Sequence, residues 1–122
     1  MSTNVLNSDR NFQIWKYTVG HRQLLLRSTK TPDLSTRIDV FFKGVRELHL
    51  PVSLDGLSIT ESSEEELRSQ CLLKSPTYGN DTKVFRLQGS NYLGYVAALV
   101  VVYHEDYGEY DDPSFFAKNN IL

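Results

Sequence analysis

The sequence has little of several residue types and patterns that carry chemistry in other proteins. Its single cysteine, Cys71, cannot form an internal disulfide and cannot build a thiolate-rich zinc or iron–sulfur site by itself. A reducing, cytoplasmic location is therefore expected. The longest apolar run, residues 92–103, has twelve residues, whereas a membrane-spanning helix needs about twenty. Because the first eleven residues are mostly polar and lack the apolar centre of a signal peptide, we expect a soluble protein with no membrane partner.

Motifs that mark catalysis are also missing. The seven glycines form no phosphate-binding loop, and no serine lies in the glycine-flanked turn of a hydrolase nucleophile. The three histidines, His21, His49 and His104, have no spacing that would bring two of them together on a metal-binding helix. The sequence therefore predicts no cofactor and no metal site, and it favours a protein that is not an enzyme.

Length and composition fit one domain. The chain has 122 residues, of which 40% are hydrophobic and 23% charged, so we expect a single globular core over residues 1–122. The ordered core should span about residues 11–112. A polar amino-terminal tail, residues 1–10, and a carboxy-terminal tail, residues 113–122, should flank it.

Alternating apolar and polar residues predict about seven strands, at residues 12–19, 23–28, 37–42, 45–50, 57–60, 83–88 and 92–104. In the third of these, Ile38, Val40 and Phe42 should face the core. The one helix signal lies at about 63–72, where Ser63 and Glu66 can form a capping box. Most connections are too short for parallel crossovers. We therefore expect an α+β fold, predominantly antiparallel β, forming a barrel-like or highly curved sheet with one short helix.

The predicted strand at residues 92–104 is apolar on both faces, which is typical of a strand that neighbours cover on both sides. We therefore expect it to lie centrally in the sheet. At an exposed edge, residues 97–103 would be an aggregation hazard, because no charged side chain protects them.

The net charge of −2 is unevenly divided along the chain. Residues 1–50 hold eight Lys or Arg against four Asp or Glu, and residues 51–122 hold five against eleven. Because the halves of a β protein interleave, we expect these charges to pair inside the fold. Basic residues among the aromatic side chains of the first strands could instead form a nucleic-acid platform. Trp15 and Tyr17 share one face and need burial, however, so nucleic acid is not the favoured partner.

The most biased stretch is the acidic segment, residues 104–113, with the sequence HEDYGEYDDP. Three interpretations remain open. Its carboxylates around Gly108 could bind a divalent cation, although their spacing departs from that of a calcium loop. It could be a solvated acidic end, or it could dock onto a basic protein through acidic and tyrosine side chains. The residues predicted for such a partner-binding surface are Asp106, Tyr107, Glu109, Tyr110, Asp111 and Asp112.

A second candidate site is the pair His104 and Asp106 at the end of the last predicted strand. Residues two apart on a strand share a face, so the carboxylate could orient the imidazole as a general base requires. A pocket at this strand end would make the protein a small-molecule-binding or hydrolytic β-barrel.

The sequence thus favours a small, non-catalytic cytoplasmic protein that acts by binding another macromolecule, most simply a protein. A homodimer is compatible with the same pattern. The identity of a partner or ligand, the oligomeric state, the strand order and the choice between a barrel and a sandwich do not follow from the sequence.

Overall fold

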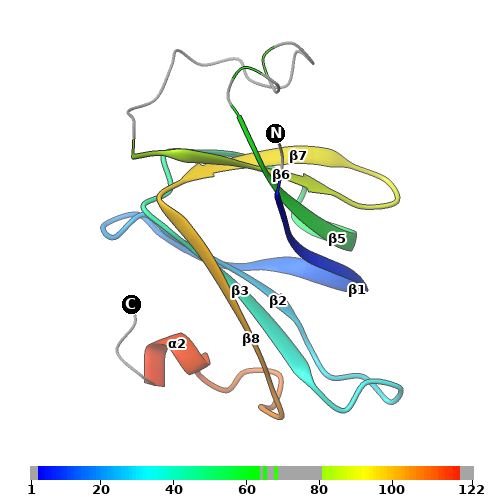
Figure 1. The fold of residues 1–122 in the computed structure, drawn as a ribbon. Helices are drawn as coiled ribbons and strands as arrows, with labels where there is room; N and C mark the ends of the chain where they lie inside the picture. The colour runs from blue at the N-terminus through cyan, green and yellow to red at the C-terminus, as the bar shows by residue number, and fades with distance from the viewer. Residues whose placement is uncertain (1–2, 64, 66–67, 69–80, 119–122) are drawn as a thin grey trace.

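The computed structural model describes residues 3–63, 65, 68 and 81–118 (Figure 1). In this part of the chain the structure has eight strands and the four-residue helix α2, besides two helical residues of the 64–80 stretch, Glu65 and Arg68. They are β1 (Thr3–Thr18), β2 (Gln23–Ser28), β3 (Arg37–Lys43), β4 (Glu47–His49), β5 (Ser53–Ser62), β6 (Lys83–Gln88), β7 (Leu93–Ala98), β8 (Val100–Asp106) and α2 (Phe115–Lys118).

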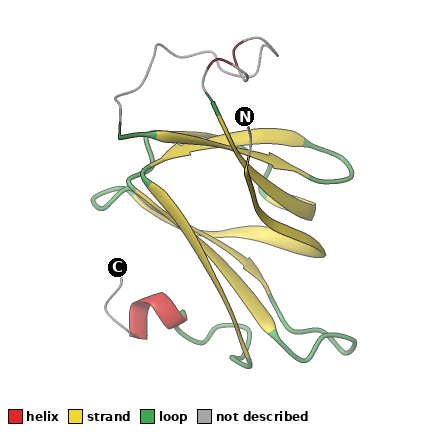
Figure 2. Cartoon of the chain, viewed as in Figure 1, coloured by secondary structure: helices red, strands yellow, loops and turns green. Residues whose placement is uncertain are grey.

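All eight strands belong to one sheet with the order β4-β7-β6-β5-β1-β2-β3-β8. Every neighbouring pair is antiparallel, which confirms the predicted predominance of antiparallel β structure. The two ends of this order, β4 and β8, do not pair with each other, so the predicted barrel is not confirmed. The strands instead form two facing layers, and β1 bends from one layer into the other (Figures 1 and 2).

A shared bend joins the layers on the side where β3 leads into β4 and β7 leads into β8. The bend lies at Gly44 and Leu99, and the N–H of Leu99 donates to the carbonyl of Lys43 at 2.9 Å. Gly44 has a φ of +67°, and a Cβ there would lie 2.5 Å from Cγ of Leu99. Glycine therefore fits this position for both conformation and space.

The bend divides the long strand expected at residues 92–104. Its first half, β7, lies between β4 and β6, as expected for a central strand. Its second half, β8, is the last strand of the sheet, and among the described residues it pairs with β3 alone. The expectation of a fully central strand is therefore wrong for β8, because the bend at Leu99 carries this half of the strand to the edge.

The hydrophobic core lies between the two layers. Ile38, Val40 and Phe42 of β3 belong to it, which confirms their predicted inward orientation. The alternate β3 residues Arg37, Asp39 and Phe41 face outward and yet are buried. Helix α2 covers part of this outer face, because Phe116 of α2 stacks on Phe41 with ring centroids 5.3 Å apart.

Both predicted tails contribute to the fold. Residues 3–10 form the start of β1 and pair with β5 from Thr3, which lies opposite Glu61. Ser114 and Phe116 are buried beyond the expected end of the ordered core. The helix expected at about 63–72 lies mostly outside the described residues, as does Cys71; of that stretch, Ser63 is described and not helical, and Glu65 and Arg68 are described and helical. Among the residues that the structure describes, no helix is long and apolar enough to cross a membrane.

Candidate functional site

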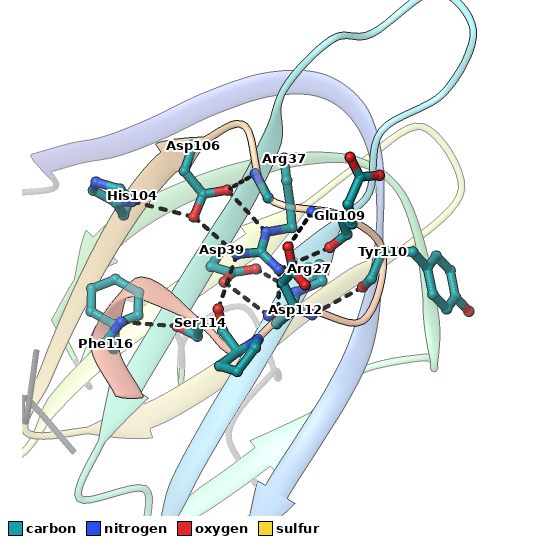
Figure 3. A network of polar contacts seen from close by, with 12 residues as sticks. Arg27, Arg37, Asp39, His104, Asp106, Glu109, Tyr110, Asp112, Ser114 and Phe116 are labelled. Atoms are coloured by element: carbon teal, nitrogen blue, oxygen red, sulfur yellow. Dashed lines mark hydrogen bonds and ion pairs between the residues drawn. The ribbon is translucent and has the colours of Figure 1, made fainter. Parts of the chain in front are cut away.

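The acidic segment begins at the end of β8 and continues over the outer face of β2 and β3 (Figure 3). Two arginines of that face lie beneath it: Arg27 on β2 and Arg37 on β3. The pairing of β2 with β3 places Arg27 opposite Asp39, and the pairing of β3 with β8 places Arg37 opposite Asp106. Each arginine therefore has a carboxylate as its direct cross-strand neighbour.

Arg37 is buried and donates five hydrogen bonds to the acidic segment. Its Nε and Nη2 bind the two carboxylate oxygens of Asp106 at 3.0 and 2.9 Å. Nη1 donates to the carbonyls of Glu109 and Asp112 at 3.1 and 2.7 Å, and Nη2 donates to the carbonyl of Pro113 at 3.2 Å. The guanidinium has five N–H donors, one for each of these five hydrogen bonds. A lysine ammonium group has only three donors and could not make the same set of contacts.

Arg27 holds the middle of the acidic segment in a similar way. Its Nε and Nη2 bind the carboxylate of Asp39 at 2.7 and 3.1 Å, and Nη1 donates to the carbonyl of Tyr110 at 3.1 Å. The guanidinium lies 4.9 Å from the ring centroid of Trp15, and that ring makes an edge contact with the ring of Tyr110. The backbone of the acidic segment is therefore attached to the sheet at four carbonyls through two arginines.

Asp106 is part of this attachment rather than a free surface charge. The hydrogen bonds from Arg37 lower the pKa of its carboxyl group, and the N–H of Gly108, 2.9 Å from Oδ1, lowers it further. Gly108 lies against the guanidinium, because a Cβ at this position would be 2.5 Å from Cζ of Arg37. Asp106 therefore remains ionised at neutral pH and is a poor proton acceptor.

Asp112 also has a role inside the acidic segment. Its carbonyl accepts from Arg37, and its carboxylate accepts a hydrogen bond from the N–H of Glu109 at 2.9 Å. The other residues of the predicted surface point to solvent: Tyr107 is 75% exposed, the Glu109 side chain is 74% exposed, and Tyr110 and Asp111 are exposed as well. Of the six predicted partner-binding residues, four thus present their side chains outward and two stabilise the segment.

The pair His104 and Asp106 does not have the geometry of a hydrogen-bonded dyad. Nδ1 of His104 is 3.9 Å from Oδ2 of Asp106 and has no hydrogen-bond partner. The imidazole stacks on Phe115 with ring centroids 3.8 Å apart. Because the Asp106 carboxylate is already bound by Arg37, it is not positioned to activate the imidazole. Within the described residues, no three His, Cys, Asp or Glu side chains are grouped to bind a metal ion together.

Charges of the two sequence halves pair across the fold, as expected. Besides Arg37 with Asp106, the Arg10 guanidinium lies 3.4 Å from the Glu105 carboxylate, and the Lys30 ammonium lies 3.0 Å from that of Glu109. Arg27 and Arg37 belong to the basic residues of the first half, which the sequence predicts to pair inside the fold without singling these two out. Two features of the sequence could have indicated that these arginines are buried. Both arginines alternate with apolar residues that face the core, and a run of carboxylates follows later in the chain.

Two surface hollows lie on either side of Arg27. One, of about 270 Å³, is lined by Asn11, Gln13, Arg27, Ser28, Thr29, Thr31, Leu34 and Tyr110. The other, of about 230 Å³, is lined by Trp15, Lys16, Leu25, Arg27, Asp111, Asp112, Pro113 and Ser114. Neither His104 nor Asp106 lines them, so the histidine pair and the hollows are separate features.

Comparisons with protein-family models, with curated proteins and with solved structures find no match to this chain.

Proposed function

We propose that this protein is a binding module whose acidic segment docks onto a basic surface of another protein. The observation that carries the proposal is the attachment of the segment to Arg27 and Arg37, which fixes its backbone while Tyr107, Glu109 and Asp111 remain exposed. A merely solvated acidic end would not require buried arginines to bind four of its carbonyls, so this attachment favours a binding surface.

Fixing the loop before binding favours recognition for a physical reason. A flexible loop loses conformational entropy when it docks, whereas a loop already held in one conformation loses less. Exposed tyrosines add contact area with few rotatable bonds, and carboxylates attract a basic partner from a distance. The combination supports fast association with a protein that presents Lys or Arg side chains.

The test reverses charge only where the carboxylates are exposed. We would compare the wild type with Glu109→Lys/Asp111→Lys, leaving Asp106 and Asp112 intact because they hold the segment in place. The ion pair of Glu109 with Lys30 is solvent-exposed, so its loss should cost little stability. A matched control, Asp9→Lys/Asp81→Lys, makes the same charge change at exposed residues elsewhere.

The measurement is a pull-down from native lysate at low and moderate salt, followed by association rates with any partner identified. We expect a partner retained by the wild type and the control to be lost or at least about tenfold slower to associate with the acidic-segment variant, most clearly at low salt. Equal association rates for all three proteins would refute the proposal.

A further inference from the structure

The edge strand β8 carries an unusual surface. It pairs with β3 over its whole length, from Arg37 opposite Asp106 to Lys43 opposite Val100, without a bulge. On its other side no strand pairs with it in the described part of the chain. This edge therefore presents a regular, seven-residue row of backbone groups.

The side chains at residues 100–103 of β8 are apolar, whereas edge strands usually carry features that prevent pairing with another chain. Residues 100–103 are Val-Val-Val-Tyr, with Val100 38% and Tyr103 51% exposed. Lysine, proline and bulges normally prevent an edge strand from pairing with another chain, and none of them occurs within β8. The opposite end of the sheet is different, because β4 has only three residues and Pro51 follows it closely. Residues 100–103 of β8 lack the protections that are found at the opposite edge strand.

We infer that β8 is a dimerisation edge, to which β8 of a second copy of this chain adds in antiparallel orientation. The distribution of charge selects this occupant and this orientation. All of the negative charge of β8 lies at one end, in Glu105 and Asp106, and its other end is apolar. Parallel addition would place the carboxylates of the two copies side by side, whereas antiparallel addition places them at opposite ends of the joint.

The side-chain pattern also selects a register. A two-fold axis perpendicular to the sheet pairs residues that face the same side, so one residue must lie opposite itself. With Val102 in that position, Val101 lies opposite Tyr103 of the second copy, and the reverse pair forms by symmetry. Both residues lie on the face that is directed to the core, because their β3 partners are Phe42 and Val40. An aromatic side chain opposite a β-branched one is a favourable cross-strand pair.

The neighbouring register is less favourable. With Tyr103 opposite itself, Glu105 would lie opposite Val101 and Asp106 opposite Val100, so carboxylates would face valines within the joint. With Val102 opposite itself, Glu105 and Asp106 lie opposite residues 99 and 98, which come before the start of β8. The contacts of α2 are with a sheet face, since Phe115 stacks on His104 and Phe116 on Phe41. Because α2 packs on a face of the sheet, it does not occupy the backbone edge of β8. With Val102 opposite itself, the sheet of one copy therefore continues into the sheet of the second copy.

The first test measures molecular mass over a range of protein concentrations by light scattering and sedimentation. The wild type should approach twice the chain mass of 14.0 kDa as concentration rises. In Val100→Lys/Tyr103→Lys, each new charge occurs twice at the joint, so the dissociation constant should rise by at least about tenfold. The control Val19→Lys/Val52→Lys changes two exposed valines away from β8 and should behave as the wild type.

A wild type that remains at 14.0 kDa throughout, or a dimer that survives the β8 lysines unchanged, overturns the inference. The second test does not depend on lysine and fixes the register. In a Cys71→Ser background, Val102→Cys should form a disulfide-linked dimer on mild oxidation, because residue 102 lies opposite itself. Val100→Cys should link far more slowly, since Val100 lies opposite His104 of the second copy. Equal linking at both positions, or none at 102, contradicts the proposed joint.

Discussion

Replacing Arg37 with methionine is the most direct test of how the acidic segment is held. Methionine keeps much of the aliphatic volume but removes every donor, leaving the Asp106 carboxylate and the carbonyls of Glu109, Asp112 and Pro113 without their partner. Removing one member of a buried ion pair costs about 3–5 kcal/mol. Because the Asp106 side chain is 24% exposed and water can reach it, we expect the low end of that range, about 3 kcal/mol.

The loss can be measured by urea denaturation followed through the fluorescence of Trp15, the only tryptophan, which contacts Tyr110 of the acidic segment. With a slope of about 1.5 kcal/mol per molar urea, the unfolding midpoint should fall by about 2 M. Arg46→Met is the matched control, because the Arg46 side chain is exposed, and its midpoint should remain close to that of the wild type.

The pH dependence separates the ion pair from general damage to the core. Arg37 lowers the pKa of Asp106 in the folded state, so the pair contributes stability above the ordinary carboxyl pKa. That contribution is lost as pH falls through the lowered pKa of the folded protein, where Asp106 becomes protonated. The difference in unfolding free energy between the wild type and Arg37→Met should therefore shrink below about pH 4. A loss under about 1 kcal/mol at pH 7, or a loss independent of acid pH, would refute this account.

Three further substitutions test other contacts. Gly108→Ala should destabilise the protein and perturb the acidic segment, because the new methyl group would lie 2.5 Å from Cζ of Arg37; an unchanged melting temperature would show that the loop can move aside. Phe116→Ala should lower the unfolding free energy by about 3 kcal/mol through loss of its buried contact with Phe41, whereas an effect near zero would mean that α2 contributes nothing to stability. Burial raises the pKa of Tyr92 to about 12, so its contribution to stability is complete below pH 10 and is lost as pH rises from 10 to 12; Tyr92→Phe should weaken this alkaline loss in a denaturation series, and an identical pH profile would contradict it.

Most strands, and the side chains of β3 that face the core, could be predicted from the sequence. Apolar residues at alternate positions identified β3 and its inward side chains Ile38, Val40 and Phe42, because a buried strand face needs period-two alternation. The bend at Leu99 could not be predicted from the sequence. An uninterrupted apolar run shows the same hydrophobic pattern whether the strand stays in one layer or crosses to another. The bend depends on Gly44 in the connection between β3 and β4, and no local pattern around Leu99 shows that contact.

The sequence marks residues 104–113 by their density of carboxylates and tyrosines, but it does not show which contacts these residues make. The structure places Tyr107 and the Glu109 side chain in solvent, and their role as a binding surface stays a prediction. The division between exposed and structural carboxylates could not be predicted, because it depends on contacts made only in the folded chain, such as those of Asp106 with Arg37 and of Asp112 with the N–H of Glu109. Asp106 and Asp111 are the same residue type in the same segment, and only Asp106 pairs with β3 through β8.

The hydrogen bonds of Arg37 also impose an order on the emergence of this protein from the ribosome. All five acceptors lie 69 to 76 positions later in the chain. In a nascent chain that has already joined β2 to β3, the Arg37 guanidinium lacks these acceptors until residues 106–113 have left the exit tunnel. The outer face of β3 is thus completed by residues that are synthesised 69 to 76 positions after Arg37.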